Sequence, residues 1–312
     1  MPSTSFPPAD DATWSGWQLL PGHTPIAPAV LAEILDGGQA FRWYRENNDA
    51  WVGTFGSSLL RLSADAGGAL RWSAPAASAK TSLALAHYWE GERPLDSLVD
   101  SLPWRSDAHL ARCLAEFPGL RILRQPFGET LLCFLCSATK QIVQIKQMVG
   151  LLAERHGERL TPGGAGSPEP VSLGYRLPSW AEIAEIPEAE LRACQLGFRA
   201  RYIHQTAKFI AAHPGWLEET EALPYAAARE RLCLLPGVGG KVADCVLLFG
   251  AGRLEAFPVD TWILKAMAAR YGLAGWKPAQ VAQFGRAHFG PLAGLAQQYL
   301  FAWERRMGRA RT

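Results

Sequence analysis

The stretch CLLPGVGGKVADC, residues 233 to 245, joins two apolar helical segments through a tight turn. Pro236 cannot continue the first helix, while Gly237, Gly239 and Gly240 permit a left-handed backbone and leave amide groups uncovered. Bare amides at the start of a helix are a ready anion site. The pattern therefore predicts two helices that meet at a tight corner and bind an anion there. A corner that uses glycine only for close packing is the alternative.

A lysine and an aspartate follow this corner. Lys241 lies in the first turn of the second helix, where the partial positive charge of the helix end disfavours a cation by up to about 1 kcal/mol. A lysine attacks carbon only as the neutral amine, which burial and a helix N-terminus both favour. Asp260, directly before the next apolar run, is an ordinary N-cap candidate, but a carboxylate fixed there could also stabilise positive charge in a substrate.

Composition limits the class of protein. The chain has 312 residues, 48% of them apolar, so it can bury a large core, and its net charge of +2 excludes a bulk polycation. Any nucleic-acid surface must therefore be a local basic patch. Cys133 and Cys136 are the one close cysteine pair, and their apolar surroundings favour buried small hydrophobes over a metal site.

The ends of the chain suggest an intracellular protein. Residues 1–13 are polar and rich in proline, which predicts a disordered leader, and no apolar run is long enough for a membrane span. We expect a reduced compartment, cytoplasmic or nucleoid-associated, or nuclear if the source is eukaryotic.

The fold class is expected to be α+β. Residues 14–103 show alternating, aromatic-rich runs separated by turns, followed by one helical segment, and predict an antiparallel sheet packed with a helix. Residues 104–312 are almost entirely helical in their periodicity, including one segment from 128 to 157. Residues 157–178 are dense in glycine and proline and predict a crossing loop.

These motifs together resemble a known family. Residues 233–262 are similar to the helix-hairpin-helix DNA glycosylases. The endonuclease III branch normally ends in a four-cysteine iron–sulfur loop, whereas no cysteine follows Cys245 here. The 8-oxoguanine branch is similar over residues 15–305, through the ordered segments GGQAFRW (37–43), RILRQPFGETLLCFLCSATKQI (121–142, its first long core helix), LGFRARY (196–202) and LAQQYLF (295–301).

The resemblance implies an activity. It points to a bifunctional DNA glycosylase and AP lyase that excises 8-oxoguanine from duplex DNA in base excision repair. The N-terminal sheet would be of the TATA-binding-protein type, and no iron–sulfur cluster or other cofactor is expected. One asymmetric lesion needs one active site, so we expect a monomer.

The resemblance also assigns roles to residues. The catalytic pair is Lys241, which attacks C1′ and forms a Schiff base before β-elimination, and Asp260. The residues implied around the flipped base are Gly38, Cys245, Gln297 and Phe301. Those implied to contact DNA are Phe198, Arg199, Gly237, Gly239, Val242, Thr139, Lys140 and Trp262. A monovalent or divalent cation is implied at the backbone carbonyls of Cys233, Leu235 and Val238.

Some positions depart from the family pattern. Thr139, Lys140 and Gln141 replace an asparagine run, Gln144 replaces an arginine that reads the opposite cytosine, and Trp262 replaces a histidine. We therefore expect a relaxed preference for the opposite base. Two alternatives stay open: a glycosylase for another damaged base, alkylated or oxidised, and a helix-hairpin-helix module that binds DNA without catalysis.

Overall fold

The computed structural model describes residues 14–20, 25–46, 50–75, 79–90, 94–160 and 170–309. The predicted leader and residues 161–169 of the predicted loop lie outside this part of the chain. The described remainder of that loop contains a short 3-10 helix, Val171–Gly174, and a β-bridge between Arg159 and Tyr175.

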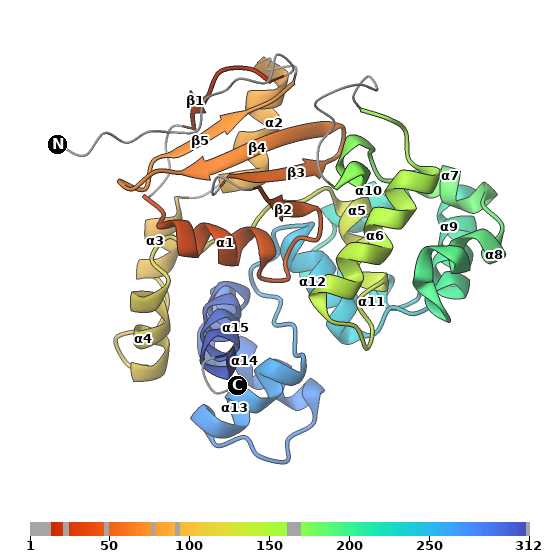
Figure 1. Ribbon diagram of the computed structural model, residues 1–312. Helices are drawn as coiled ribbons and strands as arrows, with labels where there is room; N and C mark the ends of the chain where they lie inside the picture. Colours follow the sequence, from red (N-terminus) through yellow and green to blue (C-terminus); the bar gives the residue numbers. More distant parts are fainter. Residues whose placement is uncertain are drawn as a thin grey trace.

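The N-terminal region is an antiparallel sheet with strand order β1-β5-β4-β3-β2, as expected (Figure 1). The strands are β1 Gln18–Leu19, β2 Trp43–Arg45, β3 Trp51–Phe55, β4 Ser58–Ala64 and β5 Leu70–Ser73. Helix α2, Ala79–Glu90, confirms the predicted helix.

One helix in this region was not predicted. The strand character expected from residue 14 to residue 75 is wrong over α1, Pro28–Asp36. Pro28 starts this helix, and its buried residues Val30, Leu31, Ile34 and Leu35 recur with helical spacing. The period of this nine-residue run is thus 3.6 and not 2.

The rest of the described chain is helical, which confirms the expectation. The helices are α3 Leu95–Asp100, α4 Ala108–Glu116, α5 Phe127–Leu135, α6 Ile142–His156, α7 Trp180–Glu185, α8 Glu188–Leu191, α9 Arg199–Ala212, α10 Trp216–Ala222, α11 Tyr225–Leu232, α12 Gly240–Phe249, α13 Thr261–Tyr271, α14 Pro278–Phe289 and α15 Ala293–Arg309.

The helical segment predicted over residues 128 to 157 is interrupted. Helix α5 ends at Leu135 and α6 begins at Ile142, and the residues expected to form one long core helix from 121 start in an extended conformation. Ser137 donates its hydroxyl to the Phe134 carbonyl at 2.7 Å, and Thr139 adopts a φ of +56°. A side chain that competes for helix carbonyls and a left-handed residue both end a helix.

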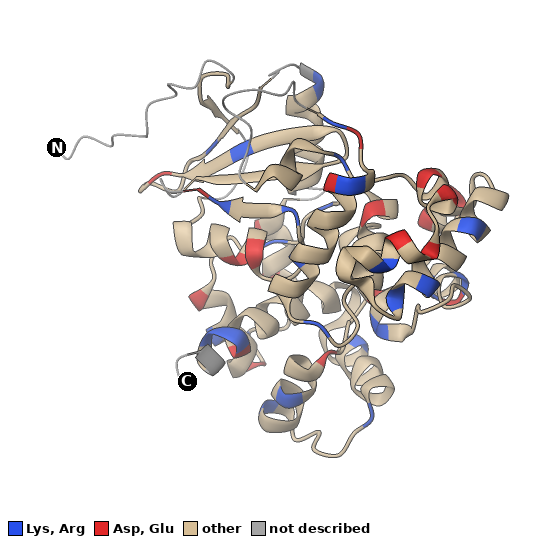
Figure 2. Cartoon of the chain, turned by 45° about the vertical axis from the view of Figure 1, so that its right-hand side comes forward, with Lys and Arg blue, Asp and Glu red and all other residues tan. Residues whose placement is uncertain are grey.

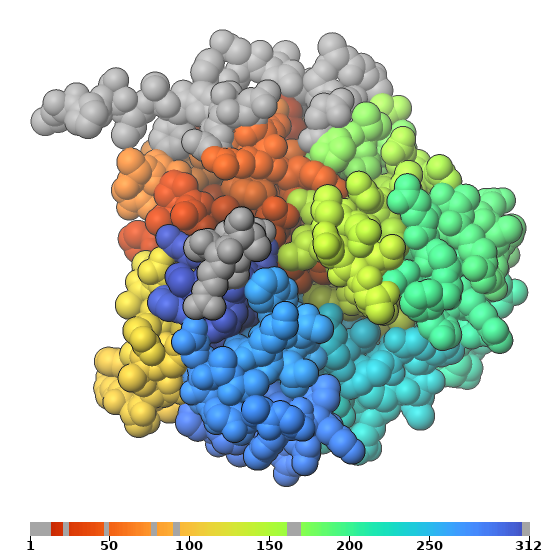
Figure 3. Space-filling model, turned by 60° about the horizontal axis from the view of Figure 1, so that its bottom comes forward, coloured from red at the N-terminus to blue at the C-terminus, as the bar shows by residue number. Residues whose placement is uncertain are grey.

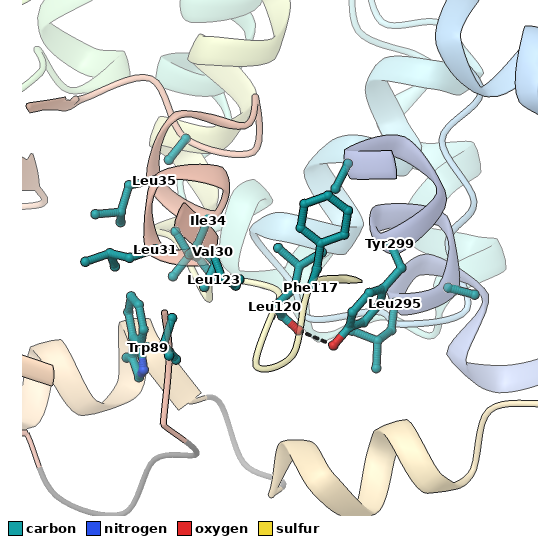
Figure 4. Packing of buried hydrophobic residues seen from close by; sticks show 14 of the residues in the cluster. Val30, Leu31, Ile34, Leu35, Trp89, Phe117, Leu120, Leu123, Leu295 and Tyr299 are labelled. Carbon is teal, nitrogen blue, oxygen red and sulfur yellow. Dashed lines mark hydrogen bonds between the residues drawn. The ribbon is translucent and has the colours of Figure 1, made fainter. Parts of the chain in front are cut away.

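Two large hydrophobic cores and a third, small cluster underlie the fold, and the large cores do not follow the order of the chain. The first core joins the sheet and α1 with the 117–123 segment and with α13, α14 and α15. Its centre includes Tyr299, whose hydroxyl donates to the Leu120 carbonyl at 2.8 Å (Figure 4). The second core is formed mainly by the helices from α5 through α12. The predicted domain boundary near residue 103 stays a prediction. The first core contains residues from both sides of that boundary.

Candidate active site

The predicted helical corner lies between α11 and α12. Gly237 has a φ of +80°, and a Cβ there would lie 2.9 Å from the Tyr202 ring. Gly239 precedes α12 with no side-chain cap and with open space where its Cβ would be. The amides at the start of α12 are thus left uncovered, as an anion site requires.

A buried carboxylate fixes the two helices of this corner. Asp244 on α12 is 2% exposed and accepts hydrogen bonds from Arg229 Nε at 2.9 Å and from the Tyr225 hydroxyl at 2.8 Å. Burial raises the pKa of Asp244, and the Arg229 charge opposes the rise. The sequence alone did not predict the pair of Asp244 and Arg229, because the two residues lie on different helices.

Lys241 extends from the first turn of α12 toward the end of α5. Its Nζ lies 3.3 Å from Ser137 Oγ and 5.0 Å from the centre of the Phe134 ring. Ser137 already donates its proton to the Phe134 carbonyl, so its oxygen accepts from the amine. Ser137 is a second residue that sequence reasoning missed.

Cys245 lies one turn beyond Lys241 on α12 and is buried. Burial raises the pKa of its thiol to about 11, against the effect of the Lys241 charge. The side chain is therefore a neutral thiol at neutral pH and acts as an apolar wall beside the amine.

Asp260 caps α13, as its sequence position suggested. Its Oδ1 accepts from the Ile263 amide at 2.8 Å. Burial raises the pKa of Asp260, while this hydrogen bond and the Lys241 charge oppose the rise. The cap fixes the direction of the carboxylate, so the structural role and an electrostatic role are compatible.

Lys241 and Asp260 line one cavity. Its deep part, of about 50 Å³, opens beside a wider cleft of about 910 Å³, and both parts are lined by Gly38, Phe134, Lys241, Asp260 and Phe301. Cys245, Gln297 and Gln298 line the deep part only.

The residues predicted around a base are thus brought together from the turn after α1, from α12 and from α15. Gln297 is 5% exposed, and its Oε1 has no hydrogen-bond partner among the described residues. A buried amide oxygen without a partner favours a polar ligand in this cavity. Red N-terminal segments, yellow-green α6 and blue C-terminal helices adjoin on the face seen in Figure 3.

Several of the residues predicted to contact DNA are exposed, and some of them line the wider cleft. Phe198 is 52% exposed and Trp262 is 38% exposed, and Thr139 and Gly239 are exposed as well. Lys140, Trp262 and the buried Val242 line the wider cleft. Lys and Arg are distributed among Asp and Glu over several elements, so the charge pattern alone does not mark one binding face (Figure 2).

Arg199 is buried in this structure, and its predicted contact with DNA stays a prediction. It is 3% exposed, and its guanidinium donates to the Ala138 carbonyl, to Thr139 Oγ1 at 3.0 Å and to the Leu196 carbonyl at 3.2 Å. A contact with an unpaired cytosine requires these hydrogen bonds to be exchanged. In this structure Arg199 instead holds the loop between α5 and α6.

The predicted cation ligands lie at the corner. The Leu235 carbonyl accepts from the Val238 amide at 3.1 Å, which leaves one lone pair for a cation. Among the described residues, no group of three or more His, Cys, Asp or Glu side chains could hold a metal ion.

None of the described helices is long and apolar enough to cross a membrane.

Comparisons with known proteins agree with this arrangement. The family model for the 8-oxoguanine DNA glycosylase N-terminal domain matches residues 24–131, and that for the HhH-GPD superfamily of base excision DNA repair proteins matches residues 134–288. The chain is 32% identical to the N-glycosylase/DNA lyase OGG1 of Arabidopsis thaliana over 90% of this chain and 78% of that protein. It is also 32% identical to a probable N-glycosylase/DNA lyase of Methanothermobacter thermautotrophicus over 68% of this chain and 72% of that protein.

Solved structures show the same fold. The Clostridium acetobutylicum 8-oxoguanine glycosylase/lyase, in complex with dsDNA containing cytosine opposite to 8-oxoG, superposes with a TM-score of 0.81 at 30% identity, covering 89% of this chain and 92% of that chain. A 3-methyladenine DNA glycosylase from Archaeoglobus fulgidus has a TM-score of 0.71 at 17% identity and shares the fold alone.

The fold and the corner with its lysine and aspartate define the class as a helix-hairpin-helix DNA glycosylase. Within that class, the chain belongs to the 8-oxoguanine DNA glycosylase family.

Proposed function

We propose that this chain is a bifunctional DNA glycosylase and AP lyase that removes 8-oxoguanine from duplex DNA in base excision repair. The observation that carries the proposal is the position of Lys241, which lines the same cavity as Asp260 and acts electrostatically on its carboxylate. Relatives over most of the chain are named as N-glycosylase/DNA lyases. DNA as the substrate also implies an intracellular location, and one complete site per chain supports a monomer.

The chemistry follows from these two residues. The target base leaves the duplex and enters the cavity. As the bond between C1′ and N9 breaks, the base takes the electron pair and the ionised Asp260 stabilises the positive charge on the sugar. The lone pair of the Lys241 amine then forms a bond to C1′, and the C1′–O4′ bond breaks as a proton passes from the amine nitrogen to O4′, which gives a Schiff base. β-Elimination then removes a proton from C2′ and breaks the bond to the 3′ phosphate, which leaves with the electron pair.

Recognition of the base would depend on Gly38. 8-Oxoguanine carries a hydrogen on N7 where guanine carries a lone pair, so a fixed carbonyl acceptor favours the damaged base. Leaving a buried polar group unpaired costs about 1 to 3 kcal/mol. Phe301 and Cys245 would hold the two faces of the base, and the free end of the Gln297 amide would bind its Watson–Crick edge.

The rest of the DNA would be held by the corner and the wedge. The amides of Gly237, Gly239 and Val242 would bind a phosphate, and a cation at the carbonyls of Cys233, Leu235 and Val238 would join the corner to the backbone. Exposed Phe198 would fill the gap left by the flipped base.

Borohydride trapping tests the proposal. The wild-type protein should form a covalent complex with a duplex that contains 8-oxoguanine, and Lys241→Ala should form none while its DNA affinity stays largely intact. Lys208→Ala is the matched control, because Lys208 is exposed on α9 and lines neither part of the cavity. Trapping on a different damaged base only would favour the alternative glycosylase, and DNA binding without any trapping would favour a non-catalytic module.

A relaxed preference for the opposite base is a separate proposal. The Arg199 guanidinium is engaged with the 138–139 loop, and Thr139, Gln141 and Gln144 replace family residues there. Excision rates of 8-oxoguanine opposite C, A, G and T should differ by less than about tenfold. A steep preference for C would refute it.

A further inference from the structure

The turn that carries Gly38 is held by side chains from two other helices. Arg305 on α15 donates from Nη1 to the Gly37 carbonyl at 2.6 Å and to Glu33 Oε1 at 2.7 Å. On the other side, Lys146 on α6 donates to Asp36 at 2.7 Å. The end of α1 is therefore fixed between α6 and α15.

Arg305 also contacts one wall of the base cavity. Its guanidinium carbon lies 5.5 Å from the centre of the Phe301 ring, one helical turn away on α15. The Arg305 residue is 6% exposed, so these contacts are made away from solvent. One guanidinium thus touches both the ring and the residue before Gly38.

The space around this turn leaves little freedom. Gly38 has a φ of +101°, and a Cβ there would lie 3.0 Å from Ile142 Cδ1 and 3.8 Å from Phe301 Cε1. A Cβ on Gly37 would overlap the backbone carbonyl of Glu33. Because the backbone is confined in this way, the hydrogen bond from Arg305 sets how far the turn lies from α15.

We propose that Arg305 is a positioning residue that sets the distance between the Gly38 carbonyl and Phe301, and thereby the preference for 8-oxoguanine over guanine. The proposal rests on the proposed function above. Arg305 also lines the wider cleft, and we assign it an effect on the base through the Gly37 carbonyl and the Phe301 ring. Its hydrogen bonds to Glu33 and Gly37 involve neither Lys241 nor Ser137, so it is given no part in the lysine chemistry.

Two activities of the same protein separate this role from a general structural one. Excision of 8-oxoguanine needs the base to be read, whereas strand cleavage at a preformed abasic site has no base to read. Arg305→Met keeps the apolar length over Phe301 and removes both hydrogen bonds. Glu33→Gln removes the ion pair but leaves the bond to the Gly37 carbonyl. Arg306→Ala is the control, since Arg306 pairs with Glu116 at the surface of the same helix.

Single-turnover excision of 8-oxoguanine should fall roughly five- to tenfold in Arg305→Met. This is the expected effect of losing the hydrogen bond to the Gly37 carbonyl, the bond that positions the turn. Cleavage of an abasic duplex should stay within about twofold, and Glu33→Gln and Arg306→Ala should keep excision within about twofold. Equal loss of both activities in Arg305→Met, or unchanged excision, would overturn the proposal.

Two further outcomes are distinguishable. If Arg305→Met does not fold, Arg305→Lys decides, because its side chain is shorter and does not bring a donor to the position of Nη1, from which both hydrogen bonds leave. Its excision should fall with abasic cleavage retained, and unchanged excision would overturn the proposal. A wild-type protein that cleaves abasic DNA but does not excise 8-oxoguanine would overturn the proposed function itself, and this inference with it.

Discussion

Replacing Asp260 by Asn separates capping from catalysis. Asn keeps a side-chain oxygen for the Ile263 amide, now 2.8 Å from Asp260 Oδ1, and is as good an N-cap as Asp. The substitution removes only the negative charge next to Lys241. Helix α13 should therefore stay intact while charge stabilisation at the sugar is lost.

The two effects have different magnitudes. Loss of one preorganised electrostatic group costs about 2.7 to 4 kcal/mol in the transition state, or roughly 10² to 10³ in rate. In contrast, Asp260→Asn should unfold at the same or higher urea concentration than wild type. Burial raises the pKa of Asp260, so its contribution to stability is lost as pH rises through the folded pKa, and a neutral side chain avoids that loss.

The assay pairs single-turnover excision with urea unfolding at pH 7, and Asp260→Ala serves as the comparison. The Ala variant should be as slow as the Asn variant but about 1 kcal/mol less stable, because it also loses the cap. The acid limb of the wild-type excision profile should lie above the ordinary pKa of 3.8. Excision by Asp260→Asn within tenfold of wild type would refute the reasoning and leave only a capping role.

Three further outcomes are expected. Burial would raise the pKa of Asp107, but hydrogen bonds from the Leu110 amide, His288 and Tyr271 hold it below its usual value. Its stabilisation is thus lost as pH falls from the ordinary pKa of 3.8 through the lowered pKa, and Asp107→Asn should flatten the decline of the urea midpoint in that acidic range. Gly237→Ala should cost roughly 1 kcal/mol or more of stability because its φ is +80°, whereas Gly239→Ala should weaken only DNA binding in a filter assay. Phe198→Ala, at a side chain 52% exposed, should slow excision while changing the free energy of unfolding by less than about 0.5 kcal/mol.

Local sequence signals predicted much of this fold. Alternating, aromatic-rich runs of sequence predicted β2 to β5, because side-chain direction alternates along a strand. The glycines and proline before Lys241 predicted the corner, since few other residues tolerate its backbone. The same local reasoning failed at α1, a nine-residue helix surrounded by strand-like sequence.

The missing parts of the site depend on contacts between distant residues. Ser137 lies 104 residues from Lys241, and Arg305 lies 268 residues from Gly37. No period or spacing reports such a pair, because the packing of α5 on α12 and of α1 against α15 decides it. The burial of Arg199 was not predicted for the same reason: a polar residue in a basic segment is exposed or buried according to the loop that packs above it, and its contact with DNA stays a prediction.

The division of the interior into two cores has a consequence for cutting the chain. A fragment that starts at residue 104 would lose Gly38 but retain the helical corner with Lys241, Asp260 and Phe301. Yet Trp43, Trp72 and Trp89, all buried in the first core, would be gone, and α13 to α15 would lose the surface on which they pack. The fragment would expose apolar surface and aggregate. The two regions of the chain should therefore be expressed together, even though their sequence motifs divide them near residue 104.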